Sequence, residues 1–314
     1  MLRLLAPAKL NLSLRVLGRR PDGYHEIETI FERIDLADEL TFEPARDLSL
    51  TCSASSLSCG DDNLVMKAAR LLAQESGSRA GAQIHLTKRI PIAAGLGGGS
   101  SDGAATLLGL NTLWRLHLSR RRLKDLAAQL GSDVPFFLEP ASVAIGRGRG
   151  EVCEPLPDVP TLFHVLVCPD AQLSARDVYQ GASFDLTASR PSITMVAHAL
   201  RNGPDMAGLA EGLWNDLEPE AIRRCPVIAL IQSHLRTQGC LASRMSGSGP
   251  SVFGLCRDAT HAQDVAAALR RLDKTSWHIV IVHTLHEDRP GDVRGKASQG
   301  TGSPTKVSVR FDGE

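Results

Sequence analysis

Hydrophobic residues alternate with small or polar ones in the first part of the chain, as they do in half-buried β-strands. Over residues 4–16, every second position from Leu10 onward is leucine or valine, so this segment predicts a strand. The sequence Arg-Pro-Asp-Gly at 20–23 predicts a turn, and two further strands are expected over 27–34 and 39–43. The N-terminal region is therefore predicted to begin as a sheet.

Helical spacing begins after this sheet. Asp62 and Asn63 precede apolar residues three and four positions apart, which predicts a capped helix from about this point. The other expected elements are helices over 104–114, 121–130, 193–200, 227–235 and 262–272, strands over 84–90, 163–168, 251–256 and 277–283, and a short strand or turn over 134–138. Strands and helices alternating over this length predict an α+β protein.

Prolines at 155, 157 and 160 predict a boundary between two domains. We expect an N-terminal domain over 1–158 and a compact α+β domain over 159–286. Residues 287–314 mix Gly, Pro, Ser, Lys and Asp with few apolar residues. Such a segment buries too little surface to fix one conformation, so a flexible tail is expected there.

Composition and charge narrow the classes of partner. The chain of 314 residues is 43% hydrophobic and 22% charged, which excludes a wholly disordered chain. Lys plus Arg (35) equals Asp plus Glu (35), which argues against nucleic-acid or membrane-surface binding. Seven scattered cysteines without a Cys-x-x-Cys pair predict reduced, mostly buried thiols. With no apolar run of about 18–20 residues, we expect a cytoplasmic protein with a small-molecule partner.

A glycine-rich loop carries the clearest chemistry. Residues 91–102 read Pro-Ile-Ala-Ala-Gly-Leu-Gly-Gly-Gly-Ser-Ser-Asp between a predicted strand and a predicted helix. Free N–H groups at such a helix start bind phosphate, although a flexible turn with a helix cap is the plain alternative. The loop lacks the lysine of a Walker motif, and the sixth position counted from Gly95 is Ser100, where a dinucleotide fingerprint needs glycine. Both common phosphate motifs are therefore excluded.

The loop resembles the second motif of the GHMP kinases, a family that includes galactokinase, homoserine kinase and mevalonate kinase. Residues 6–12 (Ala-Pro-Ala-Lys-Leu-Asn-Leu) are similar to the first motif of that family, and residues 245–251 (Met-Ser-Gly-Ser-Gly-Pro-Ser) to its third. Residues 20–25 and 131–137 resemble most the branch that phosphorylates 4-diphosphocytidyl-2-C-methyl-D-erythritol. The resemblance implies a two-domain fold with a ribosomal-S5-domain-2-like ATP domain and a ferredoxin-like C-terminal domain.

This resemblance also implies roles for individual residues. Asp133 would take the proton of the substrate hydroxyl, and Lys9 would keep that carboxylate ionised and offset charge on the transferring phosphoryl group. ATP would be held by Asn63, Lys88, Pro91, Ile92, Ala93, Ala94, Gly95, Leu96, Gly97, Gly98, Gly99, Ser100 and Ser101. Mg²⁺ would be bound through Ser100 or Ser101. The cytidine substrate would be held by Asn11, Tyr24, His25, Ser174 and Tyr179.

Plain structural roles remain open for several of these residues. Asp133 fits a turn, Lys9 an edge strand, Asn63 a helix cap and Lys88 a strand end. Tyr24 could pack on the preceding turn. The sequence departs from the family pattern in Ala93-Ala94 in place of a glycine-rich pair, Gly103 within an alanine run, Ser132 in place of an alanine, and a tail without a counterpart. These departures bear on the exact loop shape and not on the expected reaction.

The expected activity is phosphorylation of the 2-hydroxyl of the cytidine substrate by Mg-ATP, a step of the non-mevalonate route to isoprenoid precursors. Two alternatives stay open. A homoserine or mevalonate kinase would keep the glycine loop and would not need Tyr24 and His25. A regulator that binds ATP without transferring phosphate would not need Lys9 and Asp133.

Overall fold

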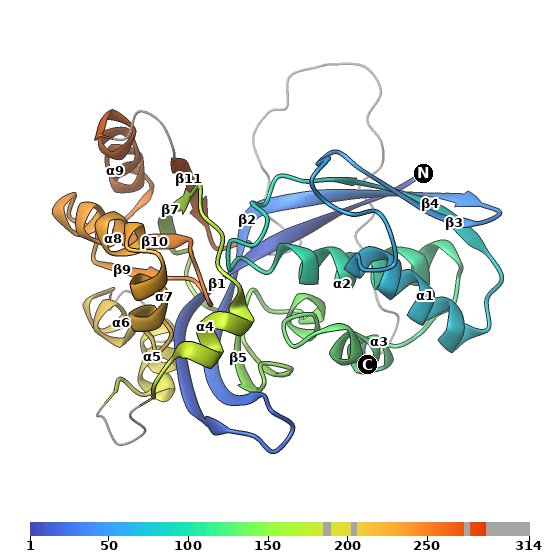
Figure 1. The fold of residues 1–314 in the computed structure, drawn as a ribbon, viewed down its shortest axis with the longest axis horizontal. Coiled ribbons are helices and arrows are strands. Elements are labelled where there is room, and N and C mark those ends of the chain that lie inside the picture. The colour runs from blue at the N-terminus through green and yellow to red at the C-terminus, as the bar shows by residue number, and fades with distance from the viewer. Residues whose placement is uncertain (185–189, 202–205, 273–276, 287–314) are drawn as a thin grey trace.

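The computed structural model describes residues 1–184, 190–201, 206–272 and 277–286. The predicted tail at 287–314 lies outside the described residues. Within them the chain forms two β-sheets with helices packed against each, as Figure 1 shows.

The first sheet is built on a long antiparallel hairpin. Strand β1 (Leu2–Arg19) pairs with β2 (His25–Ala45) along its whole length. The sheet has the order β3 (Leu48–Cys52), β4 (Gly81–Thr87), β2, β1, β8 (Trp214–Asn215), and β5 (Val143–Gly148) joins β2 and β6 (Val152–Leu156). The two strands predicted over 27–34 and 39–43 form one strand, in which residues 34–36 make a β-bulge where the pairing shifts from Lys9–Arg33 to Pro7–Ala37.

Three helices cover one face of this sheet (Figure 1): α1 (Leu64–Ser76), α2 (Gly98–Leu113) and α3 (Arg120–Leu130). Asn63 caps α1 by accepting a hydrogen bond from the N–H of Val65. Helix α2 begins six residues before the predicted start, within glycines and serines of low helix propensity, because tertiary packing outweighs propensity here. The short strand or turn expected over 134–138 is a 3-10 helix, Pro135–Leu138, whose proline suits a first turn.

The second sheet has the strand order β11 (Trp277–His283), β7 (Phe163–Pro169), β10 (Val252–Cys256), β9 (Ala242–Met245), with every pair antiparallel. This order, with helices between β7 and β9 and between β10 and β11, is ferredoxin-like, as predicted. The helices of this half are α4 (Ala175–Gly181), α5 (Ile193–Arg201), α6 (Met206–Gly212), α7 (Glu218–Arg224), α8 (Val227–Thr237) and α9 (Ala259–Leu272).

The two halves share a core. The chain changes sheet between Leu156 and Phe163. Beyond that point, however, the two-residue strand β8 returns to pair in parallel with β1. One apolar cluster contains Leu10 and Leu12 of β1 together with Leu166 of β7 and other residues of the second sheet. The hairpin is therefore packed by both halves, and its central part lies where they meet.

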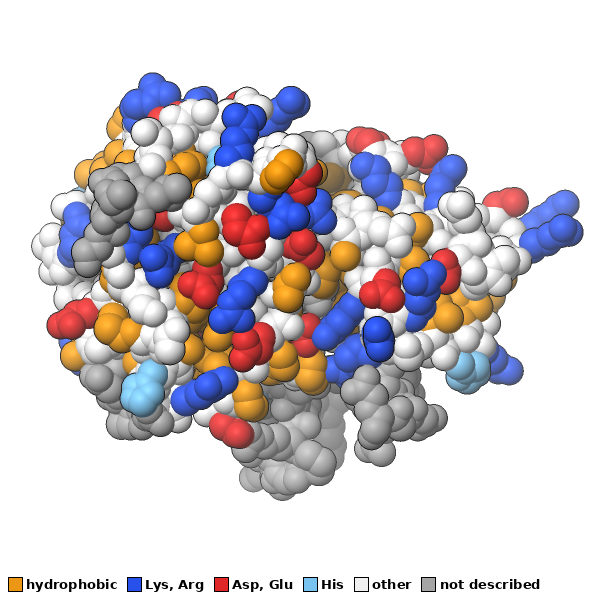
Figure 2. All heavy atoms as spheres, turned by 90° about the horizontal axis from the view of Figure 1, so that it is seen from below, with side chains coloured by type: hydrophobic (Ala, Val, Ile, Leu, Met, Phe, Trp, Pro, Cys, Tyr) orange, Lys and Arg blue, Asp and Glu red, His pale blue; other side chains and the backbone are white. Residues whose placement is uncertain are grey.

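The distribution of charged side chains on the surface and the burial of the cysteines can be compared with the sequence-based expectations. Among the described residues no helix is long and apolar enough to cross a membrane. Lys and Arg side chains are interspersed with Asp and Glu over the face drawn in Figure 2. All seven cysteines are free thiols, but only Cys168, Cys240 and Cys256 are buried, so the expectation of mostly buried thiols was too broad.

Candidate active site

The glycine loop is held in shape by its own backbone and by the residues around it. Gly95 and Gly97 have positive φ angles of 76° and 68°, which side-chain-bearing residues rarely adopt. The N–H of Lys9 donates to the carbonyl of Leu96 at 2.9 Å. A Cβ on Gly95 would lie 2.4 Å from the carbonyl oxygen of Ser246. Glycine at 95 is therefore required by contact with residues 246–249 as well as by its φ angle.

Residues 246–249 tie the loop to strand β1. The Ser246 hydroxyl donates to the Gly95 carbonyl at 3.1 Å and accepts from the N–H of Asn11 at 3.2 Å. The buried side chain of Asn215 donates from Nδ2 to the carbonyl oxygens of Met245 and Gly247, each at 2.8 Å. Three motifs distant in sequence thus form one backbone assembly.

Two cavities adjoin the glycine loop, and Gly95 and Gly97 line both. The larger, of about 680 Å³, is here called the Asp133 cavity, and the smaller, of about 370 Å³, the Lys88 cavity. Besides the two shared glycines, the predicted site residues in the Asp133 cavity are Lys9, Asn11, Tyr24, His25, Asp133 and Tyr179. Those in the Lys88 cavity are Asn63, Lys88, Pro91, Ile92, Ala93, Ala94, Leu96, Gly98, Gly99 and Ser100.

In the Asp133 cavity an enclosed cation meets a more open carboxylate. Lys9 Nζ lies 3.4 Å from Asp133 Oδ2 and donates to Asn11 Oδ1. It also lies 5.6 Å from the centre of the Phe31 ring. The Asn11 amide is oriented by donating to Thr29 Oγ1 at 2.9 Å. Buried groups hold Lys9 in place, whereas the Asp133 carboxylate remains accessible to a ligand.

Aromatic rings form the far wall of this cavity. The Tyr24 side chain is 53% exposed, and the Arg149 guanidinium lies 4.8 Å from its ring centre. His25 stacks on Tyr179 with centroids 5.2 Å apart and an interplanar angle of 25°. The rings of Phe184 and His25 form a T-shaped pair with centroids 5.4 Å apart. A flat ring entering the cavity would find aromatic faces on which to stack.

Two rings of this wall, those of His25 and Tyr179, are kept uncharged. Burial, and then the nearby Arg19 cation, lowers the pKa of His25, so its imidazole is neutral near pH 7. Burial raises the pKa of Tyr179, and the Asp133 carboxylate adds to that shift, so its hydroxyl stays protonated. Both side chains can therefore exchange hydrogen bonds with a neutral base.

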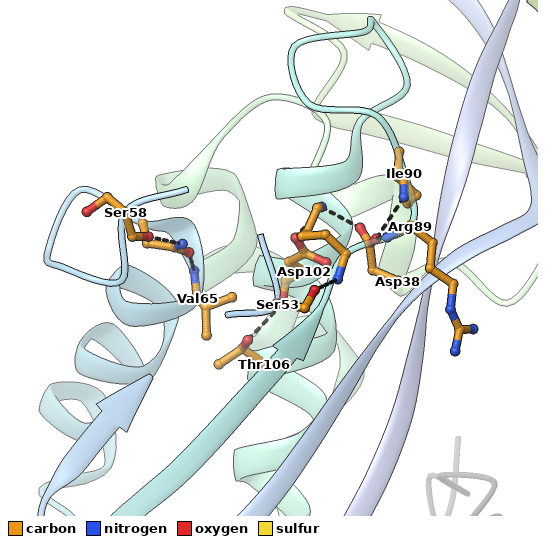
Figure 3. A network of polar contacts seen from close by, with 10 residues as sticks. Asp38, Ser53, Ser58, Val65, Arg89, Ile90, Asp102 and Thr106 are labelled. Atoms are coloured by element: carbon orange, nitrogen blue, oxygen red, sulfur yellow. Dashed lines mark hydrogen bonds and ion pairs between the residues drawn. The ribbon is translucent and has the colours of Figure 1, made fainter. Parts of the chain in front are cut away.

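In the Lys88 cavity a lysine lies between two buried carboxylates. Lys88 Nζ contacts Asp38 Oδ2 and lies 2.9 Å from Asp102 Oδ2. Asp38 Oδ1 accepts hydrogen bonds from the N–H groups of Arg89 at 2.5 Å and Ile90 at 2.9 Å. Figure 3 shows Asp38 and Asp102 on either side of this contact, with Arg89 and Ile90 above Asp38.

The charges of this group are not balanced. Burial raises the pKa of Asp102 to about 7, with Lys88 opposing the shift and Asp38 adding to it. Burial also disfavours the charge of Lys88, but the carboxylates of Asp102 and Asp38 raise its pKa overall. When all three are ionised they leave one net negative charge in the interior beside the glycine loop.

Comparison with known proteins identifies the family. A family model described as GHMP kinases N terminal domain matches residues 63–139, and one described as GHMP kinases C terminal matches residues 196–274. A protein from Pelotomaculum thermopropionicum named 4-diphosphocytidyl-2-C-methyl-D-erythritol kinase is 45% identical over 284 residues, which cover 90% of this chain and 97% of that protein. The chain belongs to the GHMP kinase family. The family predicted from the sequence is thereby confirmed, as is the prediction of a kinase.

Other relatives of this GHMP kinase agree. A protein of the same name from Gloeobacter violaceus is 40% identical over 272 residues, covering 85% of this chain and 89% of that protein. A crystal structure named 4-(cytidine 5'-diphospho)-2C-methyl-D-erythritol kinase is 36% identical, has a TM-score of 0.75 and covers 90% of this chain and 99% of that one. Homoserine kinase from Cytophaga hutchinsonii, at 19% identity and a TM-score of 0.70 with 91% and 94% coverage, shares the fold. The predicted α+β fold of the GHMP kinases is confirmed.

Two of the predicted site residues of this GHMP kinase, Ser174 and Asn63, also have a structural role as helix caps. Ser174 caps α4 by accepting a hydrogen bond from the N–H of Asp177. It is not among the residues that line the Asp133 cavity, although the next residue, Ala175, is. Asn63 both caps α1 and lines the Lys88 cavity. The Ser101 hydroxyl is buried, has no hydrogen-bond partner among the described residues and lines neither of the two cavities.

The structure adds residues to the site that the sequence did not indicate. Asp38 is 50 residues from Lys88 in sequence, and no local pattern marks it. Asp102 is the last residue of the glycine motif. From the sequence it could be interpreted only as a helix cap, and its contact with Lys88 was not predicted. Arg149 stands in an arginine-glycine run and Arg176 in α4, and both line the Asp133 cavity. The residues next to Arg149 in sequence give no sign that its guanidinium lies over the ring of Tyr24.

Proposed function

We propose that this GHMP kinase transfers the γ-phosphoryl group of ATP to the 2-hydroxyl of 4-diphosphocytidyl-2-C-methyl-D-erythritol, giving the 2-phosphate and ADP. The names of relatives at 40–45% identity support this substrate. The observation that carries the mechanism is that Gly95 and Gly97 line both cavities beside Lys9 and Asp133. A phosphate held on the loop from one cavity would face a hydroxyl held in the other.

ATP would occupy the Lys88 cavity. The first N–H groups of α2, on Gly98, Gly99 and Ser100, have no intrahelical partner and would receive the phosphates, helped by the helix dipole. The loop residues Pro91, Ile92, Ala93, Ala94, Gly95, Leu96 and Gly97 would follow the nucleotide, and Asn63 and Lys88 would flank its adenosine end. This division assigns ATP to the N-terminal domain proposed over 1–158.

Mg²⁺ would accompany ATP. No group of three or more His, Cys, Asp or Glu side chains among the described residues could hold a metal on its own. Mg²⁺ bound to nucleotides usually keeps several waters and takes few protein ligands. Ser100, which lines the cavity, suits such a site better than the enclosed Ser101. Bound there, the ion would neutralise charge on the phosphates.

The acceptor would occupy the Asp133 cavity. Its cytosine ring would stack on Tyr24 or Tyr179, and neutral His25 would hydrogen-bond to the base edge. Asn11 would contact the sugar alcohol next to Lys9. Ser174 would act near the ribose or phosphates through its position at the start of α4.

The chemistry needs positioning more than a strong base. The substrate hydroxyl oxygen bonds to the γ-phosphorus, the bond from that phosphorus to the bridging oxygen of ADP breaks, and the hydroxyl proton passes to Asp133. In the loose transition state of phosphoryl transfer the proton leaves late, so a strong base is not needed. The Lys9 ammonium would stabilise charge on the transferring oxygens.

An acceptor panel tests the proposal. ADP release would be followed with Mg-ATP and, in parallel, 4-diphosphocytidyl-2-C-methyl-D-erythritol, homoserine, mevalonate or no acceptor, and the product would be located by phosphorus NMR. Turnover with the cytidine compound alone, and a phosphate on its 2-oxygen, is the expected result. Turnover with homoserine or mevalonate would overturn the acceptor. Binding of ATP without turnover on any acceptor would favour a regulator.

A further inference from the structure

The charged group of the Lys88 cavity connects the two ends of the glycine loop. Asp38, on β2, holds the N–H groups of Arg89 and Ile90 immediately before the loop. Lys88 reaches from the same point to Asp102, the fifth residue of α2, immediately after the loop. We call Asp38, Lys88 and Asp102 the Asp38 clamp. Residues 91–101 lie between the two ends that it connects, and Figure 3 shows Asp38 with Arg89 and Ile90, and Asp102 nearby.

The first residue of α2 rests on this clamp. A Cβ on Gly98 would lie 3.2 Å from Lys88 Nζ and 3.1 Å from Ile90 Cγ2. The backbone of Lys88 is also held in place, because its backbone N–H donates a hydrogen bond to Ser53 Oγ at 2.9 Å. The N–H groups proposed to hold phosphate therefore sit on a support made of Lys88 and Ile90, whose place is set by Asp38.

The charges of the clamp argue against a direct phosphate contact by Lys88. Its ammonium already lies between two buried carboxylates, and the three together carry a net negative charge once Asp102 is ionised, as pH rises through about 7. Such a buried group stabilises a fold weakly, since desolvation offsets much of the attraction. Its negative charge also disfavours an anion nearby. What it supplies is a fixed distance between the two ends of the loop.

We propose that Asp38 is a positioning residue for the nucleotide: through Lys88 and the N–H groups of Arg89 and Ile90 it holds the glycine loop in its phosphate-binding shape. This inference rests on the proposed function. It assigns Lys88 to the support of the loop and gives Asp102 the other end of the same contact.

Two variants of equal charge separate positioning from electrostatics. Asp38→Asn and Asp102→Asn each leave one carboxylate paired with Lys88, so each removes the same net charge from the same cavity. Only Asp38→Asn places an amide group against both Lys88 and the two N–H groups that Asp38 accepts from. Binding of Mg²⁺ with the non-hydrolysable analogue AMP-PNP would be measured by calorimetry, together with KM for ATP and for the acceptor.

The expected result is a loss of at least about tenfold in AMP-PNP affinity for Asp38→Asn, and a smaller loss for Asp102→Asn, which weakens the contact with Lys88 but keeps the two N–H contacts of Asp38. KM for ATP should rise in parallel with the first change, and KM for the acceptor should stay within about twofold. Equal losses in the two variants would mean that the N–H contacts of Asp38 add nothing to loop positioning, and would overturn the proposal. So would a parallel loss of ATP and acceptor binding in Asp38→Asn, which indicates general damage to the fold.

A milder variant covers the case in which Asp38→Asn does not fold. Ser53→Ala removes only the exposed hydroxyl that accepts the Lys88 N–H. It should weaken AMP-PNP binding by about two- to threefold and leave acceptor KM unchanged, a difference on the scale of one hydrogen bond. Unchanged AMP-PNP affinity would overturn the proposal. Failure of the unmodified chain to bind AMP-PNP would instead remove the proposed function, and this inference with it.

Discussion

Two lysine–aspartate groups flank the glycine loop, one in each cavity, and they differ in what surrounds the carboxylates. Lys9 and Lys88 are both nearly enclosed. The Asp133 side chain is 31% exposed and meets Lys9 at 3.4 Å, whereas the Asp102 side chain is 3% exposed and meets Lys88 at 2.9 Å. A carboxylate that faces a cavity can change partners when a substrate arrives.

The enclosed carboxylates have no such freedom. One carboxylate oxygen of Asp38 accepts hydrogen bonds from two backbone N–H groups, and the other contacts the Lys88 ammonium. Moving any member would leave a buried charge without a partner, which costs several kcal/mol. The same pair of residue types thus serves reaction chemistry in one cavity and rigid support in the other. Accessibility of the carboxylate decides between these uses.

The largest expected effect is on the exposed carboxylate. Asp133→Asn should lower kcat by about 10²–10⁴, because the amide cannot take the hydroxyl proton. In free energy this is roughly 3–5 kcal/mol at the transition state. AMP-PNP affinity should stay unchanged, since Asp133 lies in the other cavity. Steady-state assays and calorimetry measure the two quantities.

A matched control for this variant is Asp125→Asn, which removes an exposed carboxylate from α3. Its kcat should equal that of the unmodified chain. If Asp133→Asn also kept full kcat, the comparison between the cavities would fail at its most important point, because the exposed carboxylate would then be dispensable.

The enclosed Asp102 should dominate a different measurement, the pH dependence of stability. Its pKa is raised from 3.8 to about 7, chiefly by burial. The folded chain therefore binds this proton more tightly than the unfolded chain. The resulting stability is present below pH 4 and lost as pH rises through 7. Asp102→Asn removes this titration, so it should gain on the order of 2–3 kcal/mol relative to the unmodified chain between about pH 5 and pH 8.

Urea denaturation at the two pH values measures this gain, and Asp61→Asn controls for loss of a carboxylate that pairs with Arg70 on the surface. A constant difference between Asp102→Asn and the unmodified chain across the pH range would show that Asp102 does not titrate inside the fold. The clamp would then carry its negative charge throughout this range.

Much of this architecture could be predicted from the sequence because long periodic segments carry their own signal. The strand around Leu10 and the capped helix after Asn63 were placed within a few residues, but the expected half-burial of that strand was wrong, because residues 8–14 are buried on both faces where the two halves meet. The strands β3, β5, β6, β8 and β9 and the helices α4, α6 and α7 were missed. They have two to seven residues each, too few for a period to show.

The site divides in the same way. Motif resemblance led to Lys9, Asp133 and the loop, and the structure brings these together. It could not indicate Asp38, because a single aspartate on a strand becomes special only when tertiary folding places it against Lys88 and two backbone N–H groups. Asn215 could not be predicted as a site residue either. Its contacts with residues 245 and 247 depend on strand β8, which has two residues and no detectable sequence pattern.

The aromatic wall should give an intermediate effect, limited to the Asp133 cavity. Tyr24→Ala removes a stacking face worth about 1–3 kcal/mol for a nucleobase. KM for the cytidine substrate should therefore rise by roughly 5- to 150-fold while KM for ATP is unchanged. Tyr24→Phe keeps the ring and should behave as the unmodified chain does. An equal rise in both KM values would mean that the cavities are not separate binding sites.

The smallest expected effect concerns the helix that carries Tyr179. Ser174 caps α4, a helix of seven residues, by accepting from the N–H of Asp177 at 3.3 Å. Ser174→Ala should lower the free energy of unfolding by about 1 kcal/mol, and Ser174→Asn should restore it because asparagine also caps. If the hydroxyl serves only as a cap, KM for the acceptor will follow stability and recover in Ser174→Asn. A raised KM in Ser174→Asn at restored stability would place the hydroxyl on the substrate, and α4 would then contribute a polar contact to the Asp133 cavity besides the ring of Tyr179.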